Sequence, residues 1–350
     1  MRVALHVVAG SRGGPRTYGV ALALALAGRD DLDLVVLTDQ PSAFPGIETV
    51  LLKGPRPLAD HWGVPGILRR LKPDVYHNTK NALPLRTPCP AVVTLHDLAY
   101  HHFPETWGPC SGLSLTWHHE PAARRADRVI AVSEHAKRDM IEVLGLPADG
   151  IDVIHHGVAP AFREPAGEAP DLPTPYVLSV GTIQARKNLD VLVRAVARVR
   201  ERRTGPITLA IAGRRGWKTE AFDAACRTTP VSMLGLVPDE KLPALYAHAA
   251  LFVQPSSYEG FGLTAVEAMA CGAPVVAADA GSLPEVVDRA GLLVAPRDVE
   301  GLADAIERVL DHPAERERLR QAGLERAGHF TWERSAADHM ECYRKAASKR

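Results

Sequence analysis

The sequence predicts an α/β protein made of two similar units, each a doubly wound parallel sheet. Three observations support this fold class. Short apolar runs rich in β-branched residues alternate with helical patterns along almost all of the 350 residues, as is typical of parallel strands buried on both faces. The length suits two domains, and a cluster of prolines near the middle of the chain interrupts the alternation.

The first unit is expected to span residues 1–160. Its predicted strands are 3–8, 34–37, 49–52, 75–77, 91–95, 129–132 and 153–155. Helical patterns lie between them, for example at 18–27 and 134–144, and Ser133 is well placed to cap the second of these helices. Repeated strand–helix alternation of this kind favours a doubly wound sheet.

Five prolines between positions 160 and 175 cannot continue a helix or a central strand, so we expect a linker at 161–175. The second unit is expected to span 176–330. Its predicted strands are 177–180, 209–212, 232–234, 251–254, 275–278 and 292–295. Residues 331–350 are charged and are expected to form a C-terminal helix.

Composition excludes several classes of protein. The 41 basic and 41 acidic side chains balance, which argues against a nucleic-acid partner. The five cysteines lack C-x-x-C spacing, which favours reduced thiols in a cytoplasmic protein over a zinc ribbon or a disulfide framework. The apolar N-terminal run is too short for a membrane span and is interpreted as the first strand.

The stretch 254–267 carries the most chemical information. It follows a predicted strand and leads into a helix. Gly260 and Gly262 let backbone N–H groups approach a ligand, and the helix start near 263–265 attracts an anion. Glu259 and Glu267 flank this anion site. Because carboxylates repel phosphate, we expect them to hold hydroxyl groups on either side of it, as a diphosphate with a sugar at each end would offer.

Residues 259–267, E-G-F-G-L-T-A-V-E, resemble the E-x7-E signature of glycosyltransferase family 4, which contains retaining enzymes of GT-B fold. The likeness extends to 181–188, 235–246, 270–275 and 281–285. It implies two Rossmann-like domains facing a central cleft, an acceptor-side domain at 1–160 and a nucleotide-sugar-binding domain at 176–330, with the C-terminal helix crossing back to the first. It also implies that Glu259 contacts the donor sugar and Glu267 the ribose.

A basic pair, Arg186 and Lys187, lies between a predicted strand and a helix. Two cations at the carboxyl end of a strand can neutralise a diphosphate leaving group, although a solvated basic turn is the alternative. The family commonly spaces its Arg and Lys several residues apart, and here Thr182 stands at the usual Arg position. The role of Lys187 therefore follows more directly from the resemblance than that of Arg186.

Other positions complete the predicted site. A glycine loop at 11–17 could close over a phosphate or be a simple turn, and the role of Arg16 in it is open between a salt bridge, solvent exposure and acceptor binding. His96 and Asp97 follow a predicted strand. The resemblance implies that His96 contacts the donor sugar near its 6-position and that Asp97 lies nearer the acceptor. The alternative is a structural role for His96, which is common for a lone histidine. The predicted donor-binding residues are Gly13, Gly14, Gly181, Val237, Gly260, Phe261, Gly262, Leu263, Thr264 and Glu267.

The resemblance implies a metal-independent front-face displacement without a cofactor. The expected donor is GDP-mannose, with UDP-glucose next, and the acceptor a glycan, a lipid-linked sugar or a small molecule in polysaccharide or glycoconjugate biosynthesis. A lipid-linked acceptor would suggest weak contact with the inner face of a membrane through basic residues, which could equally be solvated: Arg124, Arg125, Arg128, Lys137 and Arg138. An inactive GT-B partner subunit and a sugar-nucleotide epimerase are the alternatives, and the oligomeric state is not predicted.

Overall fold

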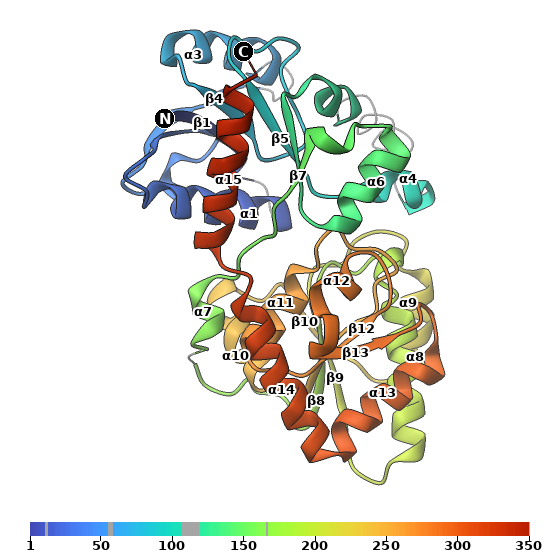
Figure 1. The fold of residues 1–350 in the computed structure, drawn as a ribbon. Coiled ribbons are helices and arrows are strands. Elements are labelled where there is room, and N and C mark those ends of the chain that lie inside the picture. Colours follow the sequence, from blue (N-terminus) through green and yellow to red (C-terminus); the bar gives the residue numbers. More distant parts are fainter. Residues whose placement is uncertain (11–12, 55–58, 107–118, 166, 350) are drawn as a thin grey trace. The chain divides into compact units, whose positions relative to one another are not determined.

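The computed structural model describes residues 1–10, 13–54, 59–106, 119–165 and 167–349. The chain divides into two compact units (Figure 1). Unit 1 consists of Met1–Gly157 together with Thr331–Arg350, and unit 2 is Val158–Phe330. The segment predicted as a linker, 161–175, falls within unit 2, where the short helix α7 (Pro160–Arg163) buries the ring of Phe162.

Within the described residues, unit 1 contains a seven-stranded parallel sheet in the order β3-β2-β1-β4-β5-β6-β7. The strands are β1 (Arg2–Val7), β2 (Asp33–Thr38), β3 (Glu48–Leu51), β4 (Val75–Asn78), β5 (Ala91–Leu95), β6 (Arg128–Ala131) and β7 (Ile151–Val153). Its helices include α1 (Gly14–Ala27), α3 (Val64–Leu71), α4 (Ala99–His102) and α6 (Glu134–Leu144). The side chain of Ser133 caps α6 by accepting a hydrogen bond from the Ala136 amide, as predicted.

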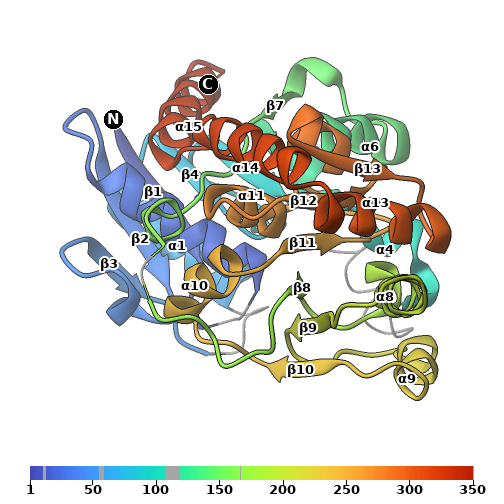
Figure 2. The same ribbon diagram turned by 90° about the horizontal axis from the view of Figure 1, so that it is seen from below.

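Unit 2 contains a second parallel sheet, with its described strands in the order β10-β9-β8-β11-β12-β13. They are β8 (Tyr176–Val180), β9 (Thr208–Ala212), β10 (Ser232–Gly235), β11 (Leu251–Gln254), β12 (Val275–Ala278) and β13 (Gly291–Val294). Besides α7, the described helices are α8 (Leu189–Arg202), α9 (Glu220–Cys226), α10 (Leu242–Ala247), α11 (Leu263–Ala270), α12 (Leu283–Val287), α13 (Val299–Asp311) and α14 (Pro313–Gly328). Figure 2 shows α8, α9 and α13 on one side of this sheet and α10 and α11 on the other.

Helix α15 (Trp332–Ala347) returns to unit 1 after the whole of unit 2 and lies beside α1 (Figure 1). Trp332, Met340 and Tyr343 belong to the same buried apolar cluster as Leu22 of α1. Gly157, the last residue of unit 1 before the chain leaves it, packs against this helix so closely that a Cβ there would lie 2.3 Å from the Trp332 nitrogen. Helix α15 is therefore part of the core of unit 1.

A chain of buried hydrogen bonds joins α15 to the sheet of unit 1. Bonds of 2.6–2.9 Å link, in order, Tyr343, His77, Thr94, Tyr18, His339 and the carbonyl oxygen of Ser335. Because a carbonyl can only accept, Nδ1 of His339 must donate to it, and with both histidine rings neutral each earlier bond runs in the same direction. This arrangement requires neutral histidines. Accordingly, burial lowers the pKa of His339 to about 4 and holds the pKa of His77 well below its usual range.

We predict that acid loosens unit 1 before unit 2. The unfolded chain binds protons on these histidines near pH 6.5, whereas the folded unit cannot, so stability is complete above about pH 6.5 and is lost as the pH falls toward 4. Amide hydrogen exchange at pH 7 and pH 5 should show a selective loss of protection in β1, β4 and β5. His339→Gln should reduce this pH dependence, and His312→Gln, at an exposed histidine of unit 2, should not. Equal protection of unit 1 at both pH values would contradict the interpretation.

Candidate functional site

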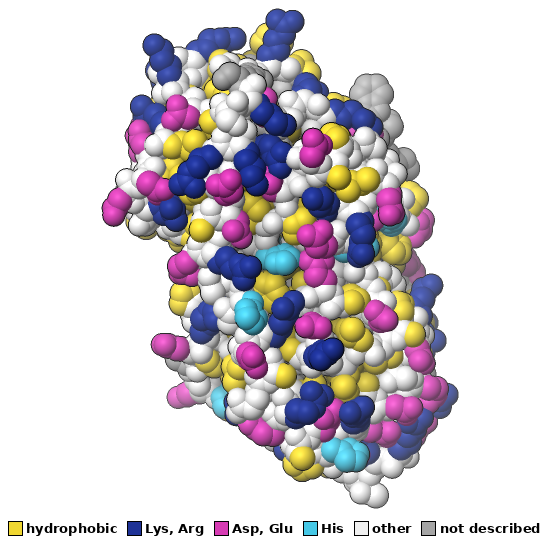
Figure 3. Space-filling view, viewed as in Figure 1, with side chains coloured by type: hydrophobic (Ala, Val, Ile, Leu, Met, Phe, Trp, Pro, Cys, Tyr) yellow, Lys and Arg dark blue, Asp and Glu magenta, His cyan; other side chains and the backbone are white. Residues whose placement is uncertain are grey.

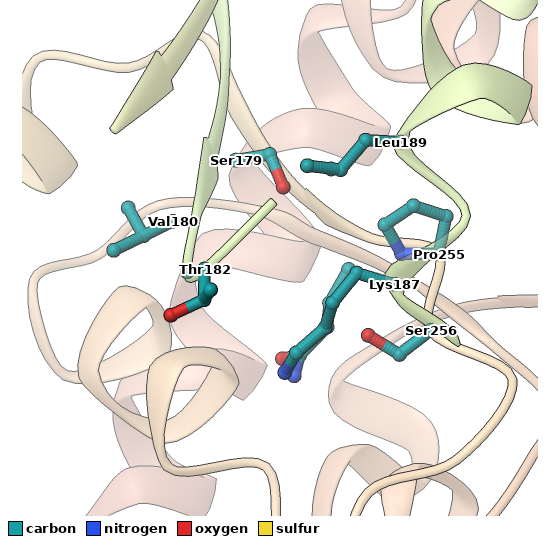
Figure 4. A pocket seen from close by; sticks show the side chains of 9 residues that line it. Ser179, Val180, Thr182, Lys187, Leu189, Pro255 and Ser256 are labelled. Carbon is teal, nitrogen blue, oxygen red and sulfur yellow. The ribbon is translucent and has the colours of Figure 1, made fainter. Parts of the chain in front are cut away.

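The strand order of unit 2 reverses between β8 and β11, which are neighbours in the sheet. Successive strands lead away from this point in opposite directions, so the loops that follow β8 and β11 diverge and leave space between them. The hollow at this position is lined by parts of both loops, including Thr182, Lys187 and Ser256, and Figure 4 shows the Lys187 side chain lying between the two segments. The basic pair and the E-x7-E stretch thus lie at the same edge of the sheet.

Asn188 ties the two loops together. It ends the 3₁₀ turn Ala185–Lys187 in a left-handed conformation with φ 47°. Its buried amide donates to the Pro255 carbonyl at 2.9 Å and to the Ser257 hydroxyl at 2.6 Å. The Ser257 amide in turn donates to the Arg186 carbonyl at 2.9 Å. These bonds hold the basic pair at a fixed position beside the second loop.

Glu259 is a buried carboxylate with a cation beside it. Lys187 Nζ contacts its Oε1, the guanidinium of Arg186 lies 3.5 Å from its Oε2, and the Gln254 amide donates to Oε1 at 2.9 Å. Burial alone would raise the pKa of Glu259, but the charges of Lys187 and Arg186 outweigh it and lower this pKa to about 2. Glu259 is therefore ionised at any physiological pH.

The backbone of Glu259 is held by the loop between β12 and α12. The amide and the hydroxyl of Ser282 both donate to the Glu259 carbonyl, at 3.2 and 3.0 Å. Gly281, with φ +61°, approaches so closely that a Cβ there would lie 2.8 Å from the Glu259 nitrogen. The stretch 281–285, which the sequence singled out only by resemblance, thus supports the first glutamate.

Arg186 is engaged differently from Lys187. Its guanidinium donates to the Tyr258 carbonyl at 2.8 Å, and its side chain is only 15% exposed. The sequence offered both residues as cations for a diphosphate, with the role of Lys187 following more directly from the resemblance than that of Arg186. Of the two, Lys187 reaches Glu259 directly, whereas Arg186 also fastens the loop that carries Glu259.

Glu267 on α11 has the opposite electrostatic surroundings. It is buried, and the Tyr246 hydroxyl of α10 donates to its Oε2 at 3.1 Å. Burial raises the pKa of Glu267 to about 8, against the Tyr246 hydrogen bond and with the help of the nearby charge of Asp239. The two glutamates of one motif are therefore held in different charge states at neutral pH.

The start of α11 carries the remaining predicted residues of this loop. Gly262 has φ 90° and precedes the helix without a side-chain cap. The first amide to donate within the helix is that of Ala265, to the Gly262 carbonyl at 2.9 Å, so Leu263 and Thr264 provide the orphan amides of the helix start. The aromatic ring of Phe261 makes an edge contact with Phe330.

Gln254 connects the two halves of the motif and was not predicted. Its amide nitrogen donates to Glu259, and its oxygen accepts from the Thr264 hydroxyl at 3.1 Å. The available signal was a buried polar residue at the last position of an otherwise apolar strand. Tyr246 was also missed as a partner of Glu267, although it ends the stretch 235–246 that carried the resemblance.

The other predicted donor-binding positions of unit 2 lie at the same edge of the sheet. Gly181, with φ +147°, directly follows β8. Its carbonyl oxygen would lie 1.9 Å from a Cβ at Gly213, so the loops after β8 and β9 are in close contact. Val237 is half-buried after β10, the edge strand.

The predicted residues of unit 1 form a separate group. Gly13, with φ 105°, precedes α1, and Gly14 is the first residue of that helix; Ser11 and Arg12 of the same loop lie outside the described residues. Arg16 Nε donates to the Ala9 carbonyl at 2.9 Å, a main-chain contact that was not among the roles considered for it.

His96 and Asp97 follow β5. Nε2 of His96 donates to the Thr79 carbonyl at 2.9 Å, and burial lowers its pKa, so the ring is neutral with its proton on Nε2. Asp97 is half-buried and accepts a hydrogen bond from the Ala99 amide at 3.1 Å.

The five basic residues considered for membrane contact lie in unit 1. Arg128 is buried and paired with Asp152 at 2.8 Å, and Lys137 donates to the Ile151 carbonyl at 3.1 Å. Arg124 and Arg125 also donate to main-chain carbonyls. On the face shown in Figure 3, basic and acidic side chains are interspersed.

In the part of the chain that the structure describes, no helix combines the length and apolarity needed to cross a membrane, and no three His, Cys, Asp or Glu side chains gather as a metal site.

Comparison with known proteins identifies the family. Residues 12–162 match the family model of Glycosyltransferase Family 4, and residues 162–326 match that of Glycosyl transferases group 1. The O-antigen chain mannosyltransferase B of Escherichia coli is 33% identical over 289 residues, covering 79% of this chain and 76% of that protein. A D-inositol 3-phosphate glycosyltransferase of a Nocardioides species is 34% identical over 265 residues, which cover 66% of this chain but only 58% of that protein.

Solved structures share the fold over the full length. Sucrose-phosphate synthase from Thermosynechococcus elongatus superposes with a TM-score of 0.77 at 24% identity, covering 100% of both chains. Anabaena HepE in complex with UDP-glucose has a TM-score of 0.72 at 20% identity, covering 98% of this chain and 100% of that one. The chain belongs to the family 4 glycosyltransferases and has their GT-B fold of two Rossmann-like domains.

Proposed function

We propose that this glycosyltransferase moves a hexose from a nucleotide sugar to a glycan, lipid-linked or small-molecule acceptor with retention of the anomeric configuration. GDP-mannose is favoured as donor because of the likeness to a mannosyltransferase of O-antigen assembly, and UDP-glucose is next because HepE was solved with it. The observation that carries the proposal is the placement of Lys187, Glu259 and Glu267 around the start of α11, at the point where the strand order reverses.

Glu259 and Glu267 suit the two sugars of such a donor. Glu259 is ionised and rigidly held, so it can accept hydrogen bonds from hydroxyls of the transferred hexose. Glu267 lies about one turn into α11, on the other side of the helix start, and can accept hydrogen bonds from the ribose hydroxyls. The half-buried backbone near Val237 is proposed to hold the base.

Lys187 and the amides of Leu263 and Thr264 are proposed to bind the diphosphate. As the bond between the anomeric carbon and the leaving phosphate oxygen breaks, negative charge accumulates on the diphosphate, and fixed cations and amides stabilise it. Arg186 adds to the field but acts first through the Tyr258 carbonyl, which places the loop. These groups supply the positive charge for the reaction without a metal ion or cofactor.

In the proposed step, the acceptor oxygen attacks the anomeric carbon on the face that the diphosphate leaves. The acceptor proton passes to the leaving phosphate oxygen, so no protein carboxylate acts as nucleophile. In unit 1, His96 is proposed to hydrogen-bond the donor sugar near its 6-position and Asp97 to contact the acceptor, while Gly13, Gly14 and Arg16 belong to a loop that contacts the substrates. The setting is polysaccharide or glycoconjugate biosynthesis, with weak contact to the inner face of a membrane if the acceptor is lipid-linked.

Donor binding gives the first prediction for this function. Thermal unfolding with GDP-, UDP-, dTDP- and ADP-sugars should show a rise of several degrees with one base, because a ligand that binds only the folded state stabilises it. EDTA should not change this rise. Glu267→Ala should abolish it, and Glu325→Ala, at an exposed glutamate of α14, should not. If none of the nucleotide sugars raised the melting temperature, the inactive partner subunit would be favoured instead.

The role of Lys187 gives the second prediction. Lys187→Gln should lower kcat by roughly 10²–10³-fold, because the leaving diphosphate loses a preorganised charge. Lys187→Arg should recover part of that loss. Initial rates at saturating donor and acceptor measure both variants. An unchanged kcat in Lys187→Gln would argue against electrostatic stabilisation of the leaving group by this residue.

Stereochemistry tests the proposed step itself. Proton NMR of the product should show the anomeric configuration of the donor, because the new glycosidic bond does not undergo mutarotation. An inverted product would refute front-face displacement. Turnover of the donor to a second nucleotide sugar in the absence of acceptor would identify the epimerase alternative.

A further inference from the structure

We propose that Tyr246 is a positioning residue of the donor site: its hydroxyl orients Glu267 toward the donor ribose, and donor binding at this pair releases a proton. The inference rests on the proposed function, in which Glu267 receives the ribose. It goes beyond that function because it adds a residue and links donor binding to pH.

The geometry fixes the Tyr246 hydroxyl. The side chain is fully buried, and its ring makes edge contacts with Phe162 and Phe252, with centroids 6.0 and 5.5 Å apart. The hydroxyl donates to Oε2 of Glu267 at 3.1 Å, and burial raises the pKa of Tyr246 well above its usual value, so this group stays a donor. One carboxylate oxygen is thereby occupied, and Oε1 is left to accept from a ligand.

Three titratable groups face Glu267, and burial disfavours its charged form. They are Tyr246 on α10, Asp239 in the 3₁₀ turn Asp239–Lys241, and Cys271, one turn further along the chain from Glu267. None of these three is a cation. The Cys271 thiol donates to the Phe162 carbonyl at 3.3 Å, and burial raises its pKa to about 12, so it stays neutral. With a pKa of about 8, Glu267 in the free protein is mostly protonated at pH 7.

Donor binding changes this balance. Ribose hydroxyls donate hydrogen bonds to a carboxylate, which favours the ionised form. The bound state therefore holds fewer protons than the free protein. Donor affinity rises with pH and levels off above about pH 8, as free Glu267 itself becomes ionised. The Tyr246 hydrogen bond lowers the pKa of Glu267, so without this bond the pKa rises and the same pH favours binding less.

Titration calorimetry tests the linkage. The donor nucleotide sugar is titrated into the whole protein at pH 7 in buffers of different ionisation enthalpy, which counts the protons exchanged. Wild type should release close to one proton, and Glu267→Gln should release none. The number of protons released by Glu267→Gln tests the linkage even if the Tyr246 variants do not fold.

Tyr246→Phe keeps the ring and removes the hydroxyl. It should raise the donor KM by roughly 10-fold, the effect of one hydrogen bond to a charged group, while kcat changes little. The pH at which donor affinity levels off should move upward. A purely structural role would not shift that pH.

Tyr176→Phe is the matched control. The buried Tyr176 hydroxyl of β8 donates to the carbonyl of Leu245, the residue before Tyr246 in the chain, at 2.6 Å. Its loss should lower the melting temperature about as much as Tyr246→Phe does, with donor KM and proton release as in wild type.

The outcomes separate the two proposals. Binding without proton release, or a Tyr246→Phe variant with the donor KM and pH profile of wild type, overturns this inference and leaves the proposed function standing. Failure of every nucleotide sugar to bind overturns both.

Discussion

The contact between Lys187 and Glu259 organises the site in unit 2. A carboxylate buried in a protein is stable as an ion only beside a cation and hydrogen-bond donors. Here the two partners lie 72 positions apart in the sequence and meet because β8 and β11 are adjacent strands at the reversal of strand order. Asn188, Arg186 and Ser282 then hold the backbone on either side of the pair. The sheet topology thus places the charged pair of Lys187 and Glu259 at a fixed position beside the start of α11.

The two glutamates of one short motif show how burial alone does not decide charge. Both are 8% exposed, yet the pKa of Glu259 lies near 2 and that of Glu267 near 8. The difference is the partner: Glu259 has an ammonium group, whereas Glu267 has a neutral phenol. Because Glu267 has no cation as partner, it lowers the free energy of unfolding above about pH 5, where the folded state holds a proton that the unfolded chain has released. That loss is consistent with a group reserved for a ligand.

Sequence patterns predicted the strands of both sheets, because buried parallel strands are continuous apolar runs, and the family resemblance implied the GT-B fold. Glycines, the helix start and spacing marked Glu259 and Glu267. They did not reveal contacts between loops. Nothing local in Arg186 indicates that its guanidinium binds the Tyr258 carbonyl, and nothing in Tyr246 indicates Glu267. Such partners are brought together only by the packing of separate βα units, so the residues of the site were more predictable than their partners.

The return of α15 to unit 1 has a consequence for how the protein is made. A chain leaves the ribosome from its N-terminus, and domains generally fold as units during synthesis. Residues 1–157 emerge first, but Trp332, Met340 and Tyr343, which fill the core of unit 1, are translated only after all of unit 2. Of the two units, unit 1 is therefore completed after unit 2. Until then the apolar surface of α1 that α15 covers stays exposed on the nascent chain, and exposed apolar surface of this kind is prone to aggregation.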